Sequence, residues 1–192
     1  DRMYINEFNT PYGMTKAAVR CAGGIADALN ELKPDLVLLT VDRVETLSSV
    51  MAASLMNFPI AHIQGGEVTG TIDESIRHAV TKMSHIHFPA TLDAAQRIIK
   101  MGEDPKLVFN TGCPYIDIIK NTKVKSKKYL ADKYLIDPDK PIIIFTQHAV
   151  TTEYNCKLDS IKITLDALKA FNNHQIIAMY SNTDAGGRQI IH

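Results

Sequence analysis

Residues 61–78, AHIQGGEVTGTIDESIRH, combine a short apolar segment, two glycines and a cluster of ionisable side chains. The members of this cluster are Glu67, Asp73, Glu74, Arg77 and His78. A loop that only joins a strand to a helix needs a turn residue and a helix cap. Carboxylates at different distances from an arginine can be held at different pKa values, so that one acts as a base and another as an acid. The stretch therefore points to acid–base chemistry.

Each of these residues also has an ordinary structural explanation. Asp73 either caps the following helix, with Glu74 complementing the helix dipole, or both act on a substrate. Arg77 lies four residues after Asp73, which is the spacing of a helix salt bridge. Gly65 and Gly66 either form a sharp turn or let the backbone approach a ligand. The residues alone leave both interpretations open.

Polar residues follow other predicted strands as well. Asp42 comes directly after LLTV and is either a helix N-cap or a site carboxylate. His148 follows IIIFT and either contacts a phosphate or hydrogen-bonds a neighbouring loop. Asn182 and Asp184 lie in SNTDAGGR, where small residues before a helix N-terminus favour an anion. Ligands of parallel sheets bind at the carboxyl ends of the strands, so a shared substrate cleft is our hypothesis.

Neither a metal site nor a cysteine nucleophile is expected. His85 and His87 point to one face of a predicted strand, as two metal ligands can, but no third ligand follows at a convincing spacing. Cys113 is more simply a buried structural cysteine. The three cysteines are far apart and odd in number, which argues against a disulfide framework and for a reducing, cytoplasmic setting.

The overall charge and the apolar runs narrow the class of partner. Lys plus Arg and Asp plus Glu both total 21, so nothing indicates a nucleic-acid or membrane partner held by bulk charge. The longest apolar runs have the length of core strands and fall far short of a membrane span. The chain starts without methionine and stops at RQIIH, in what reads as a helix just begun, so we expect a fragment.

Strand-like and helix-like segments alternate along the chain, which predicts parallel, doubly wound α/β sheets with helices on both faces. The predicted elements are helix 15–33 with Thr15 as N-cap, strand 35–41 buried on both faces, helix 45–57, strand 60–63, helix 73–84, strand 86–88, helix 92–101, strand 107–110, helix 115–121, strand 141–146, helix 152–172 and strand 176–180. We predict a first Rossmann-like domain over residues 1–121, a lysine-rich connector with one amphipathic helix over 122–140, and the start of a second Rossmann-like domain over 141–192.

Several of these segments together resemble a known family. GGEVTGTIDESIRHAVTKMSH, TVDR, TGCPYID, QHAVTTE and YSNTDAGGR are similar to the hydrolysing UDP-N-acetylglucosamine 2-epimerases, which begin sialic acid synthesis. The resemblance covers essentially all 192 residues. It implies a glycosyltransferase-B-like pair of Rossmann-like domains, both incomplete here, with a sugar nucleotide bound between them. It further implies a reaction without metal or cofactor, and we also expect a homo-oligomer.

The resemblance implies a two-stage reaction. The C2 proton of the sugar is removed and UDP is eliminated to give a 2-acetamidoglucal, and water is then added to release N-acetylmannosamine. Asp42 and Asp73 match the acid–base positions, Arg77 would hold the site carboxylates or the substrate, and His148 would assist near the leaving group. The residues after YSN would line the nucleotide side. Gly65, Gly66, Glu74, Asn182 and Asp184 complete the expected substrate-binding set.

One position departs from the family pattern. Gln64 stands where the family commonly has a catalytic glutamate, and an amide cannot exchange a proton as a carboxyl group does. Glu67, three residues later, is a candidate substitute, and a different acetamido sugar is the other explanation. The nucleotide, UDP or GDP, stays open. The alternative functions are a glycosyltransferase of the same fold and a non-catalytic fragment that binds sugar nucleotides.

Overall fold

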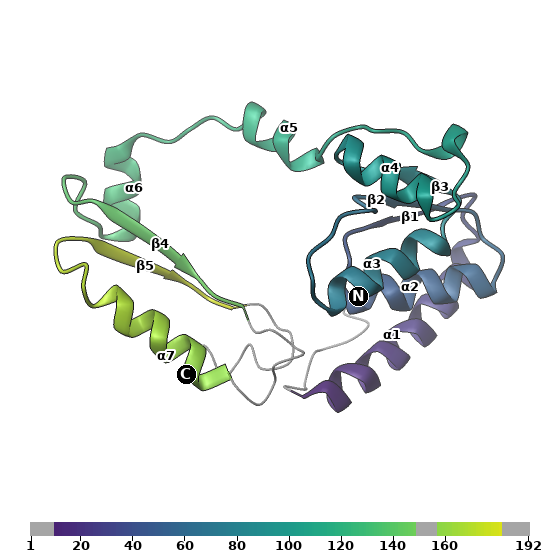
Figure 1. Cartoon of the computed structure of the whole chain (residues 1–192), viewed down its shortest axis with the longest axis horizontal. Coiled ribbons are helices and arrows are strands. Elements are labelled where there is room, and N and C mark those ends of the chain that lie inside the picture. The colour runs from purple at the N-terminus through teal and green to yellow at the C-terminus, as the bar shows by residue number, and fades with distance from the viewer. Residues whose placement is uncertain (1–9, 149–156, 182–192) are drawn as a thin grey trace. The chain divides into compact units, whose positions relative to one another are not determined.

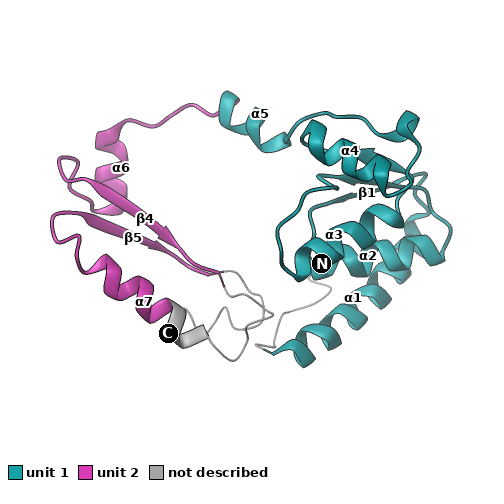
Figure 2. Cartoon of the chain, in the orientation of Figure 1, with its two compact units in different colours: residues 1–120 teal, residues 121–192 magenta. Residues whose placement is uncertain are grey.

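The computed structural model describes residues 10–148 and 157–181 of the chain. The chain divides into two compact units, residues 1–120 (unit 1) and residues 121–192 (unit 2), each with helices packed on a parallel sheet (Figures 1 and 2). Unit 1 contains strands β1 (Val37–Thr40), β2 (Ile60–Ile63) and β3 (Ile86–Phe88), hydrogen-bonded in that order. Its helices are α1 (Pro11–Leu32), α2 (Val44–Leu55), α3 (Ile72–Lys82), α4 (Leu92–Lys100) and α5 (Pro114–Asn121).

The first helix begins earlier than predicted. Thr10, and not Thr15, is the N-cap of α1, and its hydroxyl accepts a hydrogen bond of 3.1 Å from the backbone nitrogen of Gly13. Pro11 suits the first helical position because its missing N–H would have no partner there. Thr15 lies inside the helix, where its hydroxyl donates to the Pro11 carbonyl at 2.9 Å. The Thr10–Pro11 pair is the local sequence signal for this helix start.

The core of unit 1 lies between the sheet and helices α1, α2 and α3. Its buried apolar residues are Leu29, Leu39, Val50, Ala52, Ala53, Ile60, Ile76 and Val80. Together they remove from water one face of β1 and β2 and the apolar stripes of three helices, which is the main favourable contribution to folding. The same packing fixes the direction in which the chain leaves the carboxyl ends of β1 and β2.

Strand β1 is not buried on both faces. Leu39 points into the core and is 9% exposed, whereas Leu38 on the opposite face is 59% exposed. In the described part of the chain β1 is an edge strand, since β2 is its hydrogen-bonded neighbour. A continuous apolar run such as LVLL therefore marks a strand but does not establish that both of its faces are covered.

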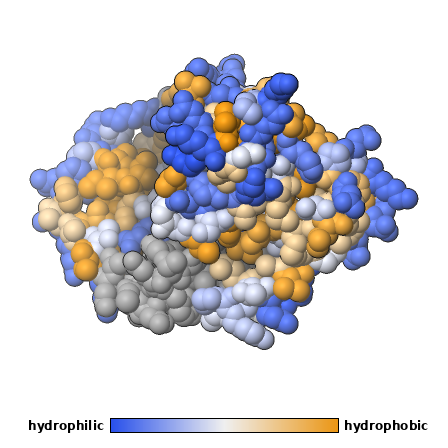
Figure 3. All heavy atoms as spheres, turned by 45° about the vertical axis from the view of Figure 1, so that its right-hand side comes forward, coloured by the Kyte–Doolittle hydropathy of each residue, from blue (hydrophilic) through white to orange (hydrophobic). Residues whose placement is uncertain are grey.

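Apolar side chains lie among hydrophilic ones on the face of the molecule drawn in Figure 3.

The predicted strand 107–110 is also absent. Pro105–Leu107 form a short 3₁₀ helix, η1, with Asp104 as its N-cap. Only Val108 then pairs with His87 of β3, as a single parallel bridge. The Asp–Pro pair starts a turn of helix that includes Leu107, the first residue of the predicted strand.

Unit 2 has a smaller sheet of two parallel strands, β4 (Ile142–Thr146) and β5 (Gln175–Met179). Its helices are α6 (Lys127–Tyr134), which lies in the stretch predicted as a connector, and α7 (Lys157–Leu168). The Gln175 side chain accepts from the backbone nitrogen of Asp137 and donates to the Asp137 carbonyl, both at 2.6 Å, so it links the segment before β4 to β5. No helix in the described residues is long and apolar enough to cross a membrane.

The loop after β2 is seated on α4 through Gly66. This residue has a φ of +83°, and a β-carbon at its position would overlap the Ala94 carbonyl oxygen and lie 2.8 Å from Ile98 Cγ1. The Gly66 carbonyl also accepts a hydrogen bond from the Arg97 guanidinium. The loop can therefore follow this path only with glycine at position 66, for steric as well as conformational reasons.

We predict that Gly66→Ala destabilises unit 1 more than Gly70→Ala does. Both glycines have positive φ, but a β-carbon at Gly70 would meet nothing within 4 Å. The left-handed backbone costs roughly 1–2 kcal/mol at either position, and overpacking adds about 2 kcal/mol at position 66 only. Urea unfolding of the two variants measures the difference, and equal losses would show that α4 does not confine the loop.

Candidate functional site

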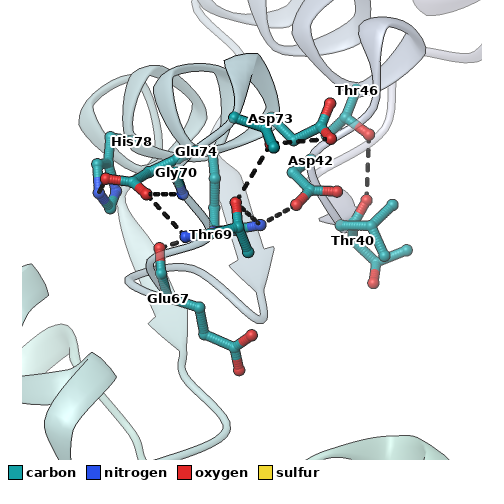
Figure 4. Close-up of polar contacts among 12 residues, drawn as sticks. Thr40, Asp42, Thr46, Glu67, Thr69, Gly70, Asp73, Glu74 and His78 are labelled. Atoms are coloured by element: carbon teal, nitrogen blue, oxygen red, sulfur yellow. Dashed lines mark hydrogen bonds and ion pairs between the residues drawn. The ribbon is translucent and has the colours of Figure 1, made fainter. Parts of the chain in front are cut away.

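The guanidinium of Arg77 is the centre of the polar cluster after β2. Arg77 lies on α3 and is 4% exposed. Its Nη1 donates to the Glu67 carbonyl at 2.6 Å, and its Nη2 pairs with the Asp42 carboxylate and approaches Thr69 Oγ1 at 3.5 Å (Figure 4). A buried cation needs such partners because leaving one unpaired is strongly destabilising. One side chain thus joins the end of β1, the loop after β2, and α3.

Asp42 is used as the partner of Arg77 and not as a helix cap. The N-cap of α2 is Arg43, which makes no side-chain capping hydrogen bond, so of the two roles considered for Asp42 the capping role does not apply. The start of α2 is held instead by the Thr46 hydroxyl, which donates to the Thr40 carbonyl at 3.1 Å. Val41 between them has a φ of +64°, and this left-handed residue turns the chain so that Asp42 faces α3.

The first turn of α3 holds the remaining acids. Thr71 is the N-cap residue, so the capping role considered for Asp73 does not apply, and the Thr71 hydroxyl donates to Asp73 Oδ2 at 3.2 Å. Glu74 accepts from the backbone nitrogens of Thr69 and Gly70, both at 2.7 Å, and these hydrogen bonds hold the pKa of Glu74 below its usual value. The Glu74 carboxylate therefore folds the loop back onto the N-terminus of its own helix.

Gln64 and Glu67 lie on a different side of the same loop. Figure 4 shows the Glu67 side chain pointing away from the Asp42 carboxylate, although the Glu67 carbonyl contacts Arg77. Gln64 has a φ of +62°, and its Nε2 donates to Cys113 Sγ at 3.2 Å. Both residues line a pocket of about 650 Å³. Its other lining residues are Ala90, Thr91, Thr111, Gly112, Cys113, Ile116, Asp117 and Lys120.

Two buried histidines lie behind the site. His62 is 0% exposed, and its ring nitrogens lie 3.2 Å from Thr81 Oγ1 and 3.3 Å from the Val41 carbonyl oxygen. His87 is 1% exposed and lies 3.3 Å from Glu103. Burial lowers the pKa of His62 to about 4 and also lowers the pKa of His87. From the sequence, His62 counts only among the histidines that could suggest a metal site, and its contacts with Val41 and Thr81 were not predicted.

The other predicted site residues are placed as follows. His148 is exposed and lies just after β4 in unit 2. Asn182 and Asp184 lie outside the described residues. Gly65 packs against the side chains of β2 and α3. Within the described residues no three side chains of the metal-binding types are grouped as a metal site.

The comparisons with known proteins decide the family. The pattern that defines the UDP-N-acetylglucosamine 2-epimerases matches residues 3–192. The chain belongs to this family. A UDP-N,N'-diacetylbacillosamine 2-epimerase (hydrolyzing) of Legionella pneumophila is 39% identical over 92% of the chain and 47% of the relative. A GDP/UDP-N,N'-diacetylbacillosamine 2-epimerase (hydrolyzing) of Campylobacter jejuni is 38% identical over 84% of the chain and 42% of the relative. The resemblance in sequence is thus confirmed.

Solved structures of the family share the fold. The UDP-GlcNAc 2-epimerase of Neisseria meningitidis bound to UDP-GlcNAc gives a TM-score of 0.73 at 20% identity, covering 93% of this chain and 51% of that one. The enzyme of Methanocaldococcus jannaschii in complex with UDP-GlcNAc and UDP gives 0.74 at 17% identity, covering 91% and 49%. The predicted glycosyltransferase-B-like α/β fold is confirmed. The chain spans about half the length of the curated relatives it matches.

The lowered pKa of His62 predicts that stability falls as the pH is lowered from about 6.5 towards 4. In that window the unfolded chain binds a proton at His62 that the folded chain does not, so protonation favours unfolding; above pH 6.5 both states are neutral there. The full effect of a shift from 6.5 to about 4 is on the order of 3 kcal/mol. Urea unfolding at several pH values measures this dependence. In His62→Gln the free energy of unfolding should change less steeply with pH between 6.5 and 4. An unchanged dependence on pH would show that His62 does not cause the loss of stability.

Proposed function

We propose that the complete protein is a hydrolysing 2-epimerase of acetamido-sugar nucleotides. The observation that carries this proposal is the pairing of Asp42 with Arg77, which sets two acids from different elements, Asp42 and Asp73, in one cluster. Supporting it are the family to which the chain belongs and the relatives whose names state hydrolysing 2-epimerases. The named relatives act on UDP- or GDP-linked sugars with two acetamido groups, so this substrate class is proposed beside UDP-N-acetylglucosamine.

The proposed chemistry is an elimination followed by an addition. A carboxylate takes the proton from C2 while the bond from C1 to the UDP oxygen breaks, which leaves a C1–C2 double bond. A protonated acid then delivers a proton to the other face of C2 while the oxygen of a water adds to C1, and the carboxylate left by that acid takes the proton that the water gives up. We assign these two roles to Asp42 and Asp73, with the Arg77 guanidinium fixing the position of the Asp42 carboxylate. The route needs no metal and no cofactor.

Gln64 and Glu67 are assigned to the substrate side of the site. Both line the 650 Å³ pocket, which is large enough for a sugar. The Gln64 amide can donate to an acetamido or hydroxyl oxygen, and Glu67 can accept from a sugar hydroxyl. The loop between these pocket residues and the two acids is shaped by Gly65, Gly66 and Glu74. His148, Asn182 and Asp184 are proposed to serve the nucleotide and the leaving group. A cytoplasmic location and a homo-oligomer stay predictions.

The test is acceptor-free turnover by the complete reading frame that contains this chain. Proton NMR would follow UDP-N-acetylglucosamine and UDP-N,N'-diacetylbacillosamine in separate incubations without any acceptor. Release of UDP together with a free 2-epimerised sugar supports the proposal. Release that requires a sugar or protein acceptor would indicate a glycosyltransferase instead.

We predict that Asp73→Asn lowers this turnover by about 10²–10⁴-fold, as expected for loss of an acid–base group. Asp93→Asn is the matched control, because Asp93 occupies the same position of α4, two residues after the N-cap Thr91. Asp93→Asn should turn over the sugar nucleotide at the same rate as the unmodified protein. Full activity of Asp73→Asn would remove Asp73 from the acid–base set.

A binding protein without catalysis is the second candidate, and Gln64 is the observation that favours it. An amide at this position cannot exchange protons, so binding of the sugar nucleotide could persist where turnover is lost. The same NMR experiment separates the two. Binding without turnover in the unmodified protein, with turnover gained in Gln64→Glu, would establish that catalysis has been lost at this position.

A further inference from the structure

We propose that His62 is a positioning residue that fixes Asp42 against Arg77, for the reaction proposed above, on which this inference rests. The imidazole of His62 bridges two backbone segments that carry the acid–base cluster. One ring nitrogen, Nε2, lies 3.3 Å from the Val41 carbonyl oxygen, and the other, Nδ1, lies 3.2 Å from Thr81 Oγ1. Val41 directly precedes Asp42, and Thr81 lies one helical turn after Arg77 on α3.

The two contacts of His62 define one tautomer of a neutral ring. A carbonyl oxygen can only accept, so Nε2 carries the proton and donates it to Val41. Nδ1 is then an acceptor, and the Thr81 hydroxyl donates to it. Both His62 and Thr81 are 0% exposed, so water does not compete for these hydrogen bonds. The ring is therefore held from both sides in a single orientation.

Val41 is the backbone position that needs this support. Its φ of +64° lies in the left-handed region, which a β-branched residue adopts only under strain. This conformation turns the chain after β1 so that the Asp42 carboxylate meets the Arg77 guanidinium. A hydrogen bond to the Val41 carbonyl holds the peptide plane that leads into Asp42. Loss of that bond would let the residue relax towards extended backbone and withdraw the carboxylate.

Gly65 seals the same arrangement from the loop side. A β-carbon at Gly65 would lie 2.8 Å from His62 Nδ1 and 2.7 Å from Thr81 Oγ1. Only glycine lets the loop cross directly over this hydrogen bond. Gly65 therefore has a structural role in addition to its predicted substrate role, because it closes the space around the His62 ring.

His87 provides a matched control for His62. The two residues are direct partners in the parallel pairing of β2 and β3, and both are buried. The ring of His87 contacts Glu103 at 3.3 Å, on a different part of unit 1 from Val41 and Asp42. Replacing either histidine removes a buried ring of the same size, but the hydrogen bonds of His62 lead to Val41 and Thr81, whereas that of His87 leads to Glu103.

The experiment compares His62→Leu, His62→Gln and His87→Leu in the complete protein. We expect His62→Leu to lower kcat by about 10²-fold with a small change in KM, because a misplaced catalytic group costs turnover of that order. The amide of His62→Gln keeps a hydrogen-bond donor near the position of Nε2. Its kcat should therefore be at least tenfold higher than that of His62→Leu. His87→Leu should keep kcat within about threefold at temperatures below its Tm. Equal kcat losses in the two leucine variants would overturn the proposal.

A second readout does not depend on the proposed reaction. With ¹⁵N-labelled arginine, the solvent exchange of the Arg77 guanidinium protons should accelerate at least tenfold in His62→Leu and in Thr81→Val, and stay unchanged in His87→Leu. If the unmodified protein turns over no sugar nucleotide but this exchange pattern holds, the proposed function fails and the positioning role stands. Unchanged exchange in both His62→Leu and Thr81→Val would contradict the positioning role, whatever the activity.

Discussion

The buried guanidinium of Arg77 organises unit 1 around its candidate site. The Arg77 side chain is 5% exposed, so its charge must be balanced by protein groups and not by water. The balancing groups come from the end of β1 (Asp42) and from the loop after β2 (the Glu67 carbonyl and Thr69). The parallel sheet brings these segments to one edge, and the guanidinium locks them together there. The groups that neutralise Arg77 are thus the same groups that define the geometry of the site.

The loop between β2 and α3 has two chemically different sides. On one side lie Asp42, which follows β1, and Asp73, at the start of α3 (Figure 4), while the pocket side carries Gln64 and Glu67. The tight glycines and the Glu74 hydrogen bonds hold the loop in the path that separates the two sides. In the function proposed for the complete protein, this arrangement separates the side chains that hold the sugar, Gln64 and Glu67, from the acids that exchange protons with it.

The sequence predicts the regular elements well wherever local patterning decides them. Strands β2 and β3 have the predicted bounds because apolar β-branched residues are flanked there by turn and cap signals. Two predictions fail because a local Xaa–Pro signal was not weighed, at Thr10–Pro11 and at Asp104–Pro105. Other roles could not be predicted because they depend on partners distant in sequence. Asp42 looks like a helix cap until Arg77, 35 residues later, is seen to pair with it. His62 looks like one more buried histidine until its ring is seen between Val41 and Thr81. Such roles arise from tertiary contacts that no local pattern records.

The central claim is that Asp42 and Arg77 form one energetic unit, and a double-mutant cycle tests it most directly. The free energy of unfolding at pH 7 would be measured for Asp42→Asn, Arg77→Met and the double variant. We predict a coupling of at least about 2 kcal/mol, because each single change leaves the other group without its partner in a mostly buried place. The half-exposed Arg43–Glu45 pair, measured in the same way, should give less than about 1 kcal/mol. A coupling for Asp42 and Arg77 no larger than that of the half-exposed pair would contradict the account.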